Sequence, residues 1–188
     1  YPPVAGQRIH YVIYARDGSS LGNVARDPAE GSHSFSLLAY RVYDFEDDSV
    51  LTVVSGTDWQ WGVPTSGPGL AHSGQKLWAT NLDGNYSNSA DARLVTPEID
   101  LRNAESAVFR FWHWYRFEYS SGRLWDGGNV KISVDGGPFE VVEPTGKGYD
   151  HVVDPYNRVL GGERAFGGPE GTGDFWHPAY IDLRPYVG

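Results

Sequence analysis

The feature that most constrains the fold is the middle third of the chain, Trp59 to Gly137, where apolar and β-branched residues come in short runs. Each run ends at Gly, Pro, Asn or Asp, which is typical of short antiparallel strands joined by tight turns. The alternation is clearest from Ala107 to Glu118, where both faces of the predicted strand carry large aromatic residues. We expect this strand to be central and covered on both sides. No window repeats at helical spacing, so the sequence predicts an all-β fold, most simply a two-sheet antiparallel sandwich.

Further strands are predicted on both sides of this stretch. Arg8 to Ala15 and Ser34 to Tyr43 alternate near the N-terminus, with a long loop predicted from Asp17 to His33. Asn129 to Val134, with Val130, Ile132 and Val134 expected to point inward, precedes Asp135-Gly136, a strong hairpin turn pair. Phe139 to Val142 is the expected partner strand, and Phe175 to Leu183 is the last one.

The segment Glu143 to Gly173 is predicted to be mostly loop, because glycine recurs along it. A loop of this length inside a compact domain is usually functional, or is ordered by a partner or an ion.

Composition narrows the class of protein. A chain of 188 residues suits one domain, and the absence of cysteine excludes disulfide and thiolate chemistry. A formal net charge of −9 argues against nucleic-acid binding, because little here would neutralise phosphates. No apolar run approaches the ~20 residues of a membrane-spanning helix, so membrane insertion is not expected.

Four motifs carry a resemblance to a known family. They are W-x-W-G-x-P-x-S-G-P-G-x-A-x-S-G-x-x-x-W-A-T-N-L-x-G-x-Y, L-x-T-P-x-I-D-L, F-x-F-W-H-W-Y-x-x-E and D-G-G-N-V-x-I-S-x-D-G-G. In this order they resemble a MAM-like jelly-roll module of secreted bacterial proteins, such as immune-inhibitor-type metallopeptidases, subtilisin-like peptidases and surface adhesins. The resemblance covers Phe45 to Gly188. It implies a jelly-roll sandwich, an extracellular or cell-surface location in a bacterium or archaeon, and an accessory role without chemistry of its own.

The strand order looks permuted relative to that family. Its I-D-L-x-x-Y-x-G element is normally followed by two strands that close the sandwich, and here strands of that type lie instead within residues 1–44. We expect these strands to complete the sandwich body of residues 45–188, in the same chain or in a neighbouring copy. Exchange between copies would propagate into a head-to-tail filament. The side chains expected to make this contact are Ile9, Tyr11, Val12, Ile13, Leu37, Leu38 and Tyr40.

Acidic loop residues suggest a cation site. Calcium takes six to eight oxygen ligands, which loops at a sandwich edge can supply. We therefore expect a structural calcium ion at carboxylates from among Glu46, Asp91, Glu118 and Asp126. The alternative is that these acids are solvated turn residues.

Exposed aromatic residues suggest a second kind of site. Trp125 and Trp176 each adjoin a polar loop and are the predicted glycan-binding residues, although tryptophans in such a module are more often core residues. Asn85 begins an N-glycosylation sequon, which predicts a surface loop.

Catalysis is not expected. The six histidines never form HExxH, and Ser73 lacks the G-x-S-x-G frame of a nucleophile elbow. The predicted function is therefore that of a non-catalytic extracellular structural or adhesive module. Such a module could be the subunit of a head-to-tail filament or a tandem repeat, and its expected partners are other copies of itself or adjacent domains. The alternative is a glycan- or protein-binding accessory module of a secreted hydrolase.

Overall fold

The computed structural model describes residues 8–17, 23–36, 40–47, 51–56, 58–146, 148–169, 171–173 and 175–188. The chain divides into two compact units, unit 1 (Tyr1–Tyr43) and unit 2 (Asp44–Gly188). The described residues contain strands and one 3₁₀ turn, η1 (Arg184–Tyr186), and no α-helix. The all-β prediction is confirmed. No helix within the described ranges has the length and apolar character needed to cross a bilayer.

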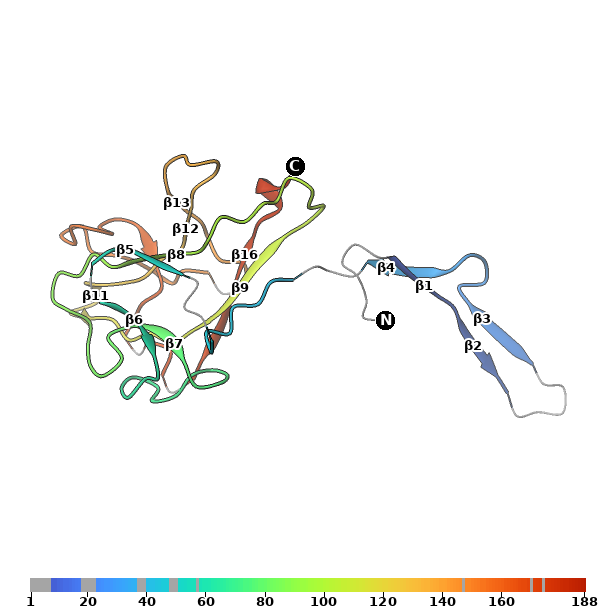
Figure 1. Ribbon diagram of the computed structural model, residues 1–188, viewed down its shortest axis with the longest axis horizontal. Helices are drawn as coiled ribbons and strands as arrows, with labels where there is room; N and C mark the ends of the chain where they lie inside the picture. The colour runs from blue at the N-terminus through green and yellow to red at the C-terminus, as the bar shows by residue number, and fades with distance from the viewer. Residues whose placement is uncertain are drawn as a thin grey trace. The chain divides into compact units, whose positions relative to one another are not determined.

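Unit 1 is a narrow antiparallel ribbon (Figure 1). Strand β1 (Arg8–Tyr11) pairs with β4 (His33–Ser36), and β2 (Ile13–Arg16) pairs with β3 (Val24–Asp27). Because β3 lies inside the segment predicted as a long loop, that part of the prediction is wrong. The strand has only 4 residues and lies between glycine- and aspartate-rich segments, so its alternation was too short to be recognised in the sequence.

A bulge interrupts the ribbon between β3 and β4, opposite Val12. The guanidinium of Arg26 holds this bulge by donating hydrogen bonds to the carbonyl oxygens of Pro28 and Gly31. Its Nε also donates to the hydroxyl of Tyr14 at 3.2 Å. One side chain therefore satisfies backbone acceptors that the ladder leaves unpaired.

Unit 2 consists of short strands in antiparallel pairs. The pairs are β5·β8, β6·β7, β9·β16, β10·β11, β12·β13 and β14·β15. The strands are β5 (Thr52–Ser55), β6 (Trp59–Gly62), β7 (Leu77–Thr80), β8 (Arg93–Val95), β9 (Val108–His113), β10 (Tyr119–Ser120), β11 (Arg123–Leu124), β12 (Lys131–Ile132), β13 (Glu140–Val141), β14 (His151–Val152), β15 (Arg164–Ala165) and β16 (His177–Asp182). Each ladder of the described residues holds two strands, so the jelly-roll sandwich stays a prediction.

Single bridges and tyrosine hydroxyls connect these ladders. Leu124 bridges to Val153, which joins β11 to the end of β14. Thr145 bridges to Tyr180 in β16, its N–H donating to the carbonyl oxygen at 2.7 Å. The hydroxyl of buried Tyr149 accepts a hydrogen bond from a backbone N–H at the start of the β12 region, at 2.8 Å. Isolated backbone bridges and the Tyr149 hydroxyl thus connect strand pairs that do not share a sheet.

The core of unit 2 contains two clusters of buried side chains. Leu124, Val153 and Ala165 form one, and Tyr149, Phe166 and Ala179 form the other. Aromatic residues from the end of β9 pack against the second cluster, which places the longest ladder, β9·β16, beside it. Burial of these side chains is the main source of stability in this unit.

The longest predicted strand forms, as β9, but only one of its faces is covered along its whole length. Phe109, Phe111 and His113 are partly buried, whereas Val108 on the opposite face is 61% exposed. The expectation of cover on both sides is therefore wrong. On the more exposed face the guanidinium of Arg110 lies over neighbouring aromatic rings, and the ring of His72 stacks on Trp112 at 3.8 Å, so this face is covered only in part.

The predicted hairpin turn is confirmed. Asp135 and Gly136 have φ of 49° and 75°, and the N–H of Gly137 donates to the carbonyl oxygen of Val134 at 2.9 Å. Two successive positive φ values are those of a type I′ turn. Because Val134 opens the turn, it is half exposed and does not point into the core as predicted.

Candidate ligand-binding site

Two neighbouring hollows lie in unit 2 and share Tyr115 and Gly171. Hollow A, of about 180 Å³, is lined by these two residues, Asp150, His151 and the segment Gly167 to Pro169. Hollow B, of about 290 Å³, lies against the end of the β9·β16 ladder. The long glycine-rich loop, which the sequence predicts to be functional or to be ordered by a partner or an ion, supplies most of hollow A.

Tyr115 is positioned by the loop that faces it. Its N–H donates to the hydroxyl of Thr172 at 3.1 Å, and the N–H of Thr172 donates to the carbonyl oxygen of Tyr115 at 3.0 Å. Gly171 makes this approach possible, because a Cβ there would lie 2.3 Å from that same carbonyl oxygen. Its φ of 60° also favours glycine. The glycine therefore fixes the wall common to both hollows.

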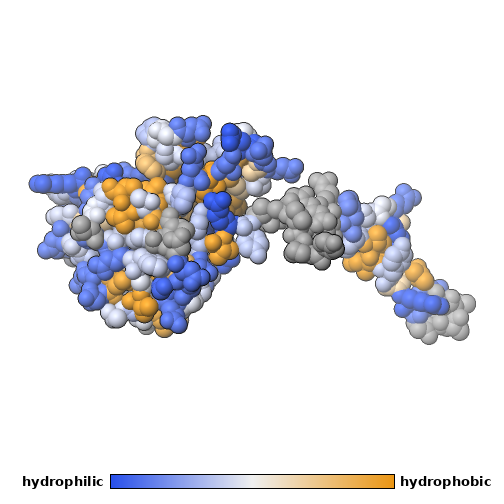
Figure 2. Space-filling model, in the orientation of Figure 1, coloured by the Kyte–Doolittle hydropathy of each residue, from blue (hydrophilic) through white to orange (hydrophobic). Residues whose placement is uncertain are grey.

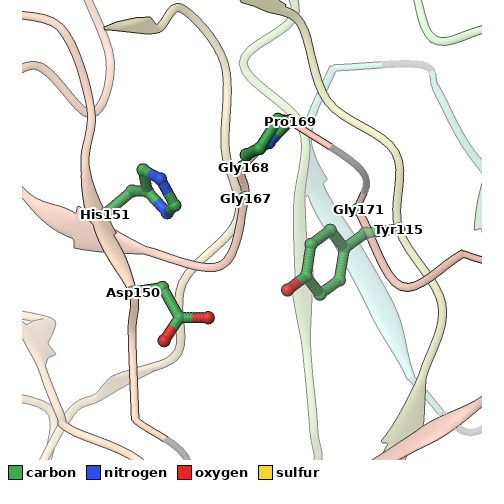
Figure 3. Close-up of a pocket in the computed structure, with 7 residues that line it drawn as sticks. All are labelled: Tyr115, Asp150, His151, Gly167, Gly168, Pro169 and Gly171. Carbon is green, nitrogen blue, oxygen red and sulfur yellow. The ribbon is translucent and has the colours of Figure 1, made fainter. Parts of the chain in front are cut away.

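The side chains of Tyr115, Asp150 and His151 point into hollow A (Figure 3). His151 begins β14, and its imidazole packs edge-on to Tyr119 with ring centroids 5.5 Å apart. Gly168 lies close to the imidazole, since a Cβ there would sit 3.0 Å from Cε1. Nδ1 of His151 is buried and has no hydrogen-bond partner among the described residues. A hydroxyl, a carboxylate and an imidazole thus surround one small space.

Hollow B is more aromatic. His113 and His177 face each other across β9 and β16 and both line it. The ring of His113 packs against Phe166 at 4.3 Å, and Tyr180 and Thr145 lie along the same wall. Together the two hollows present aromatic faces with hydrogen-bond donors and acceptors at their edges.

The sequence did not single out Asp150, His151 or Tyr115. Asp150 lies in a loop, His151 begins β14 and Tyr115 follows β9, and the Tyr115–Thr172 contact holds the glycine-rich loop at the strand end. The available signal was an Asp-His pair in the middle of a glycine-rich segment.

Of the four predicted cation ligands, Glu46 and Asp91 have protein partners. Oε1 of Glu46 accepts hydrogen bonds from the N–H groups of Lys76, at 2.9 Å, and Gln75, at 2.8 Å. These bonds lower the pKa of Glu46 below its ordinary value. Asp91 pairs with Arg93, with Nε 2.9 Å from Oδ1. Both carboxylates therefore serve local structure.

Glu118 and Asp126 meet at Tyr86. The Tyr86 hydroxyl donates to Oδ2 of Asp126 at 3.1 Å and accepts from the N–H of Glu118 at 3.1 Å. Burial raises the pKa of Tyr86 to about 12, and the nearby carboxylates add to the shift. Asn157 also donates to Asp126, at 3.2 Å. No three His, Asp or Glu side chains of the described segments converge as metal ligands, and the calcium site stays a prediction.

The predicted glycan-binding tryptophans lie outside both hollows. Trp125 is partly buried, and its indole N–H donates to the hydroxyl of Ser120 at 2.8 Å. Trp176 is also partly buried, with its ring edge-on to His72 at 6.3 Å. Asn85, the predicted glycosylation site, is exposed.

The predicted assembly residues lie mostly on the ribbon of unit 1. Ile13 is 53% exposed, Tyr11 44% and Tyr40 85%, while Val12 is partly exposed. Ile9 belongs to β1, and Leu37 and Leu38 lie outside the described residues. Figure 2 shows apolar surface along this ribbon. Both core clusters consist of residues of unit 2, and the apolar side chains of the ribbon belong to neither of them.

Comparison with known proteins gives one informative similarity. No protein-family model and no solved structure matches the chain. A stretch of 120 residues, 62% of this chain, is 37% identical to part of Bacillopeptidase F from Bacillus subtilis (strain 168). Since unit 1 has only 43 residues, most of the matched stretch lies in unit 2. The match covers 8% of that protein's length, so this chain is similar to a small segment of a much longer bacterial peptidase.

Proposed function

We propose that the chain is a non-catalytic accessory module of a longer, secreted bacterial peptidase, and that it binds a glycan or protein. The observation that carries this proposal is the 37% identity to a segment that makes up 8% of Bacillopeptidase F. A segment that small leaves most of the peptidase outside the match.

Two further observations support the proposal. The motifs between Phe45 and Gly188 resemble MAM-like jelly-roll modules, which accompany catalytic domains in secreted proteins, and we propose the same sandwich for unit 2. Hollows A and B give this unit a concave surface with aromatic and hydrogen-bonding groups, the usual make-up of a binding site.

The test uses the purified chain in two assays. Incubated with casein and with fluorogenic peptides, it should release no product. Mixed with insoluble polysaccharide or insoluble protein and centrifuged, it should be retained on at least one of these materials, because an accessory module localises an enzyme. Turnover of a peptide, lost in a variant of a residue lining the hollows, would overturn the proposal.

A second candidate function is assembly through unit 1. The exposed Ile13 and Val24 favour it, because a two-stranded ribbon is marginal in water without a covering layer. In this case the ribbon would complete the sandwich of its own chain or of a neighbouring copy. Light scattering after gel filtration distinguishes closure within one chain from exchange between copies, since only exchange gives a mass that rises with protein concentration.

A further inference from the structure

We propose that hollows A and B form one binding site for a neutral oligosaccharide, with consecutive sugar units in the two hollows and Tyr115 between them. This inference rests on the proposed function and names the ligand class of its binding surface. The shared Tyr115 and Gly171 place the hollows side by side.

The size of the hollows suits a polymer of small units. At about 180 and 290 Å³ they fall below the ~300–1,000 Å³ of a pocket that encloses a drug-sized molecule. Each therefore accommodates one small unit. A ligand that fills both must continue across the wall formed by Tyr115 and Gly171, as adjacent residues of a chain do.

The lining matches the chemistry of sugars. Sugar hydroxyls both donate and accept hydrogen bonds, and the carboxylate of Asp150 and the hydroxyls of Tyr115 and Thr145 are suitable partners. An ionised carboxylate has about four lone-pair positions, so Asp150 can accept from a ligand in addition to a protein donor. The apolar faces of sugar rings pack on aromatic rings, and Tyr115 supplies such a ring to both hollows.

Charge argues for a neutral ligand. The described residues that line the hollows include Asp150 but neither lysine nor arginine. The whole chain also carries a formal net charge of −9, which repels anions. Acidic polysaccharides and phosphorylated ligands would therefore bind poorly.

Glycine-rich backbone also argues against an extended peptide as the ligand. Peptides that lie in an extended form usually add a strand to an open sheet edge. Hollow A is walled mostly by loop, from Gly167 to Pro169 and at Gly171, and His151 of β14 is the one strand residue among the described residues that line it. It therefore offers little continuous strand edge to which a peptide could add a strand.

The experiment titrates the full chain with cellotriose, maltotriose and chitotriose, followed by calorimetry and by amide chemical shifts. At least one trisaccharide should bind with a Kd of about 1 mM or tighter, the affinity expected of a shallow site. Asp150→Asn and Tyr115→Phe should each weaken that binding by about tenfold, the loss expected for about one hydrogen bond. Asp135→Asn, the same change in the hairpin turn outside both hollows, should leave it unaltered.

Three results would overturn the inference. One is that none of the trisaccharides binds. Another is that binding persists in Asp150→Asn but is lost in Trp125→Ala, which would place the glycan at the tryptophan predicted from the sequence. The third is that an unfolded protein such as reduced casein binds at the hollows and the sugars do not. The proposed accessory role survives each of these results and fails only if the chain itself hydrolyses peptides.

Discussion

Gly171→Ala should destabilise unit 2 by several kcal/mol, whereas Gly136→Ala, a matched change, should cost much less. Both glycines have positive φ, 60° and 75°, so alanine pays the same left-handed penalty of about 1–2 kcal/mol at each position. Nothing lies within 4 Å of a Cβ built at Gly136. A Cβ at Gly171 would lie 2.3 Å from the carbonyl oxygen of Tyr115, which is backbone and has no flexible end to move aside.

The magnitude of the difference follows from what must move. To relieve the contact, the loop has to withdraw from Tyr115, which breaks the reciprocal hydrogen bonds between Tyr115 and Thr172. Each such bond contributes about 1 kcal/mol, and the partly buried groups left unpaired add a similar cost. Gly171→Ala should therefore lose about 2–3 kcal/mol more than Gly136→Ala.

The assay is urea unfolding at 25 °C followed by tryptophan fluorescence. All seven tryptophans lie in unit 2, so the signal reports the unit that contains both glycines. The slope m should stay constant and the midpoint should shift. Equal losses in the two variants, within about 0.5 kcal/mol, would refute the close approach of loop and strand that defines the hollows.

Four further outcomes are expected. Leu124→Ala should cost about 3 kcal/mol in urea unfolding, because the side chain is 2% exposed in the core; a loss below about 1 kcal/mol would contradict that packing. The pKa of Glu46 is lowered in the folded state, so its contribution to stability is present above the ordinary value of 4.5 and fades as pH falls below it. Melting curves of Glu46→Gln should accordingly lose part of the acid sensitivity of the parent chain, and identical pH profiles would argue against this role. If calcium binds near Glu118 and Asp126, as the sequence predicts, EDTA should lower the melting midpoint and added calcium should restore it; an unmoved midpoint would end that prediction. If copies associate through unit 1, Ile13→Asp should reduce the mass measured by light scattering, and a mass that is unchanged from the parent's and independent of concentration would exclude exchange.

Local sequence signals predicted the elements of this fold well. Period-two alternation located β9, and Asp135-Gly136 predicted the hairpin turn, because both signals depend on residues adjacent in the chain. The expectation of cover on both faces of β9 failed because alternation does not distinguish an aromatic face under a second layer from one covered by an arginine side chain.

The candidate site was harder to predict. Tyr115 lies in the strand region and Asp150 in a loop, and neither stands in a motif of known chemistry. They line the same hollow beside Gly171 and Thr172, and Thr172, which contacts Tyr115, comes 57 residues after it in the chain. Loop length and glycine content indicated the segment, but only the fold identified the side chains that face each other.

The pairing of β9 with β16 determines when unit 2 is able to fold. β16 is the last strand of the chain, and its Ala179 and Ile181 are almost fully buried. A polypeptide emerging from the ribosome therefore lacks these core side chains, and the partner of β9, until the final residues of the unit have been made. Contacts between such distant segments also form slowly. The core cluster that contains Ala179, and the ladder of the longest strand, are thus completed only after the strand at the C-terminal end of the unit has been made.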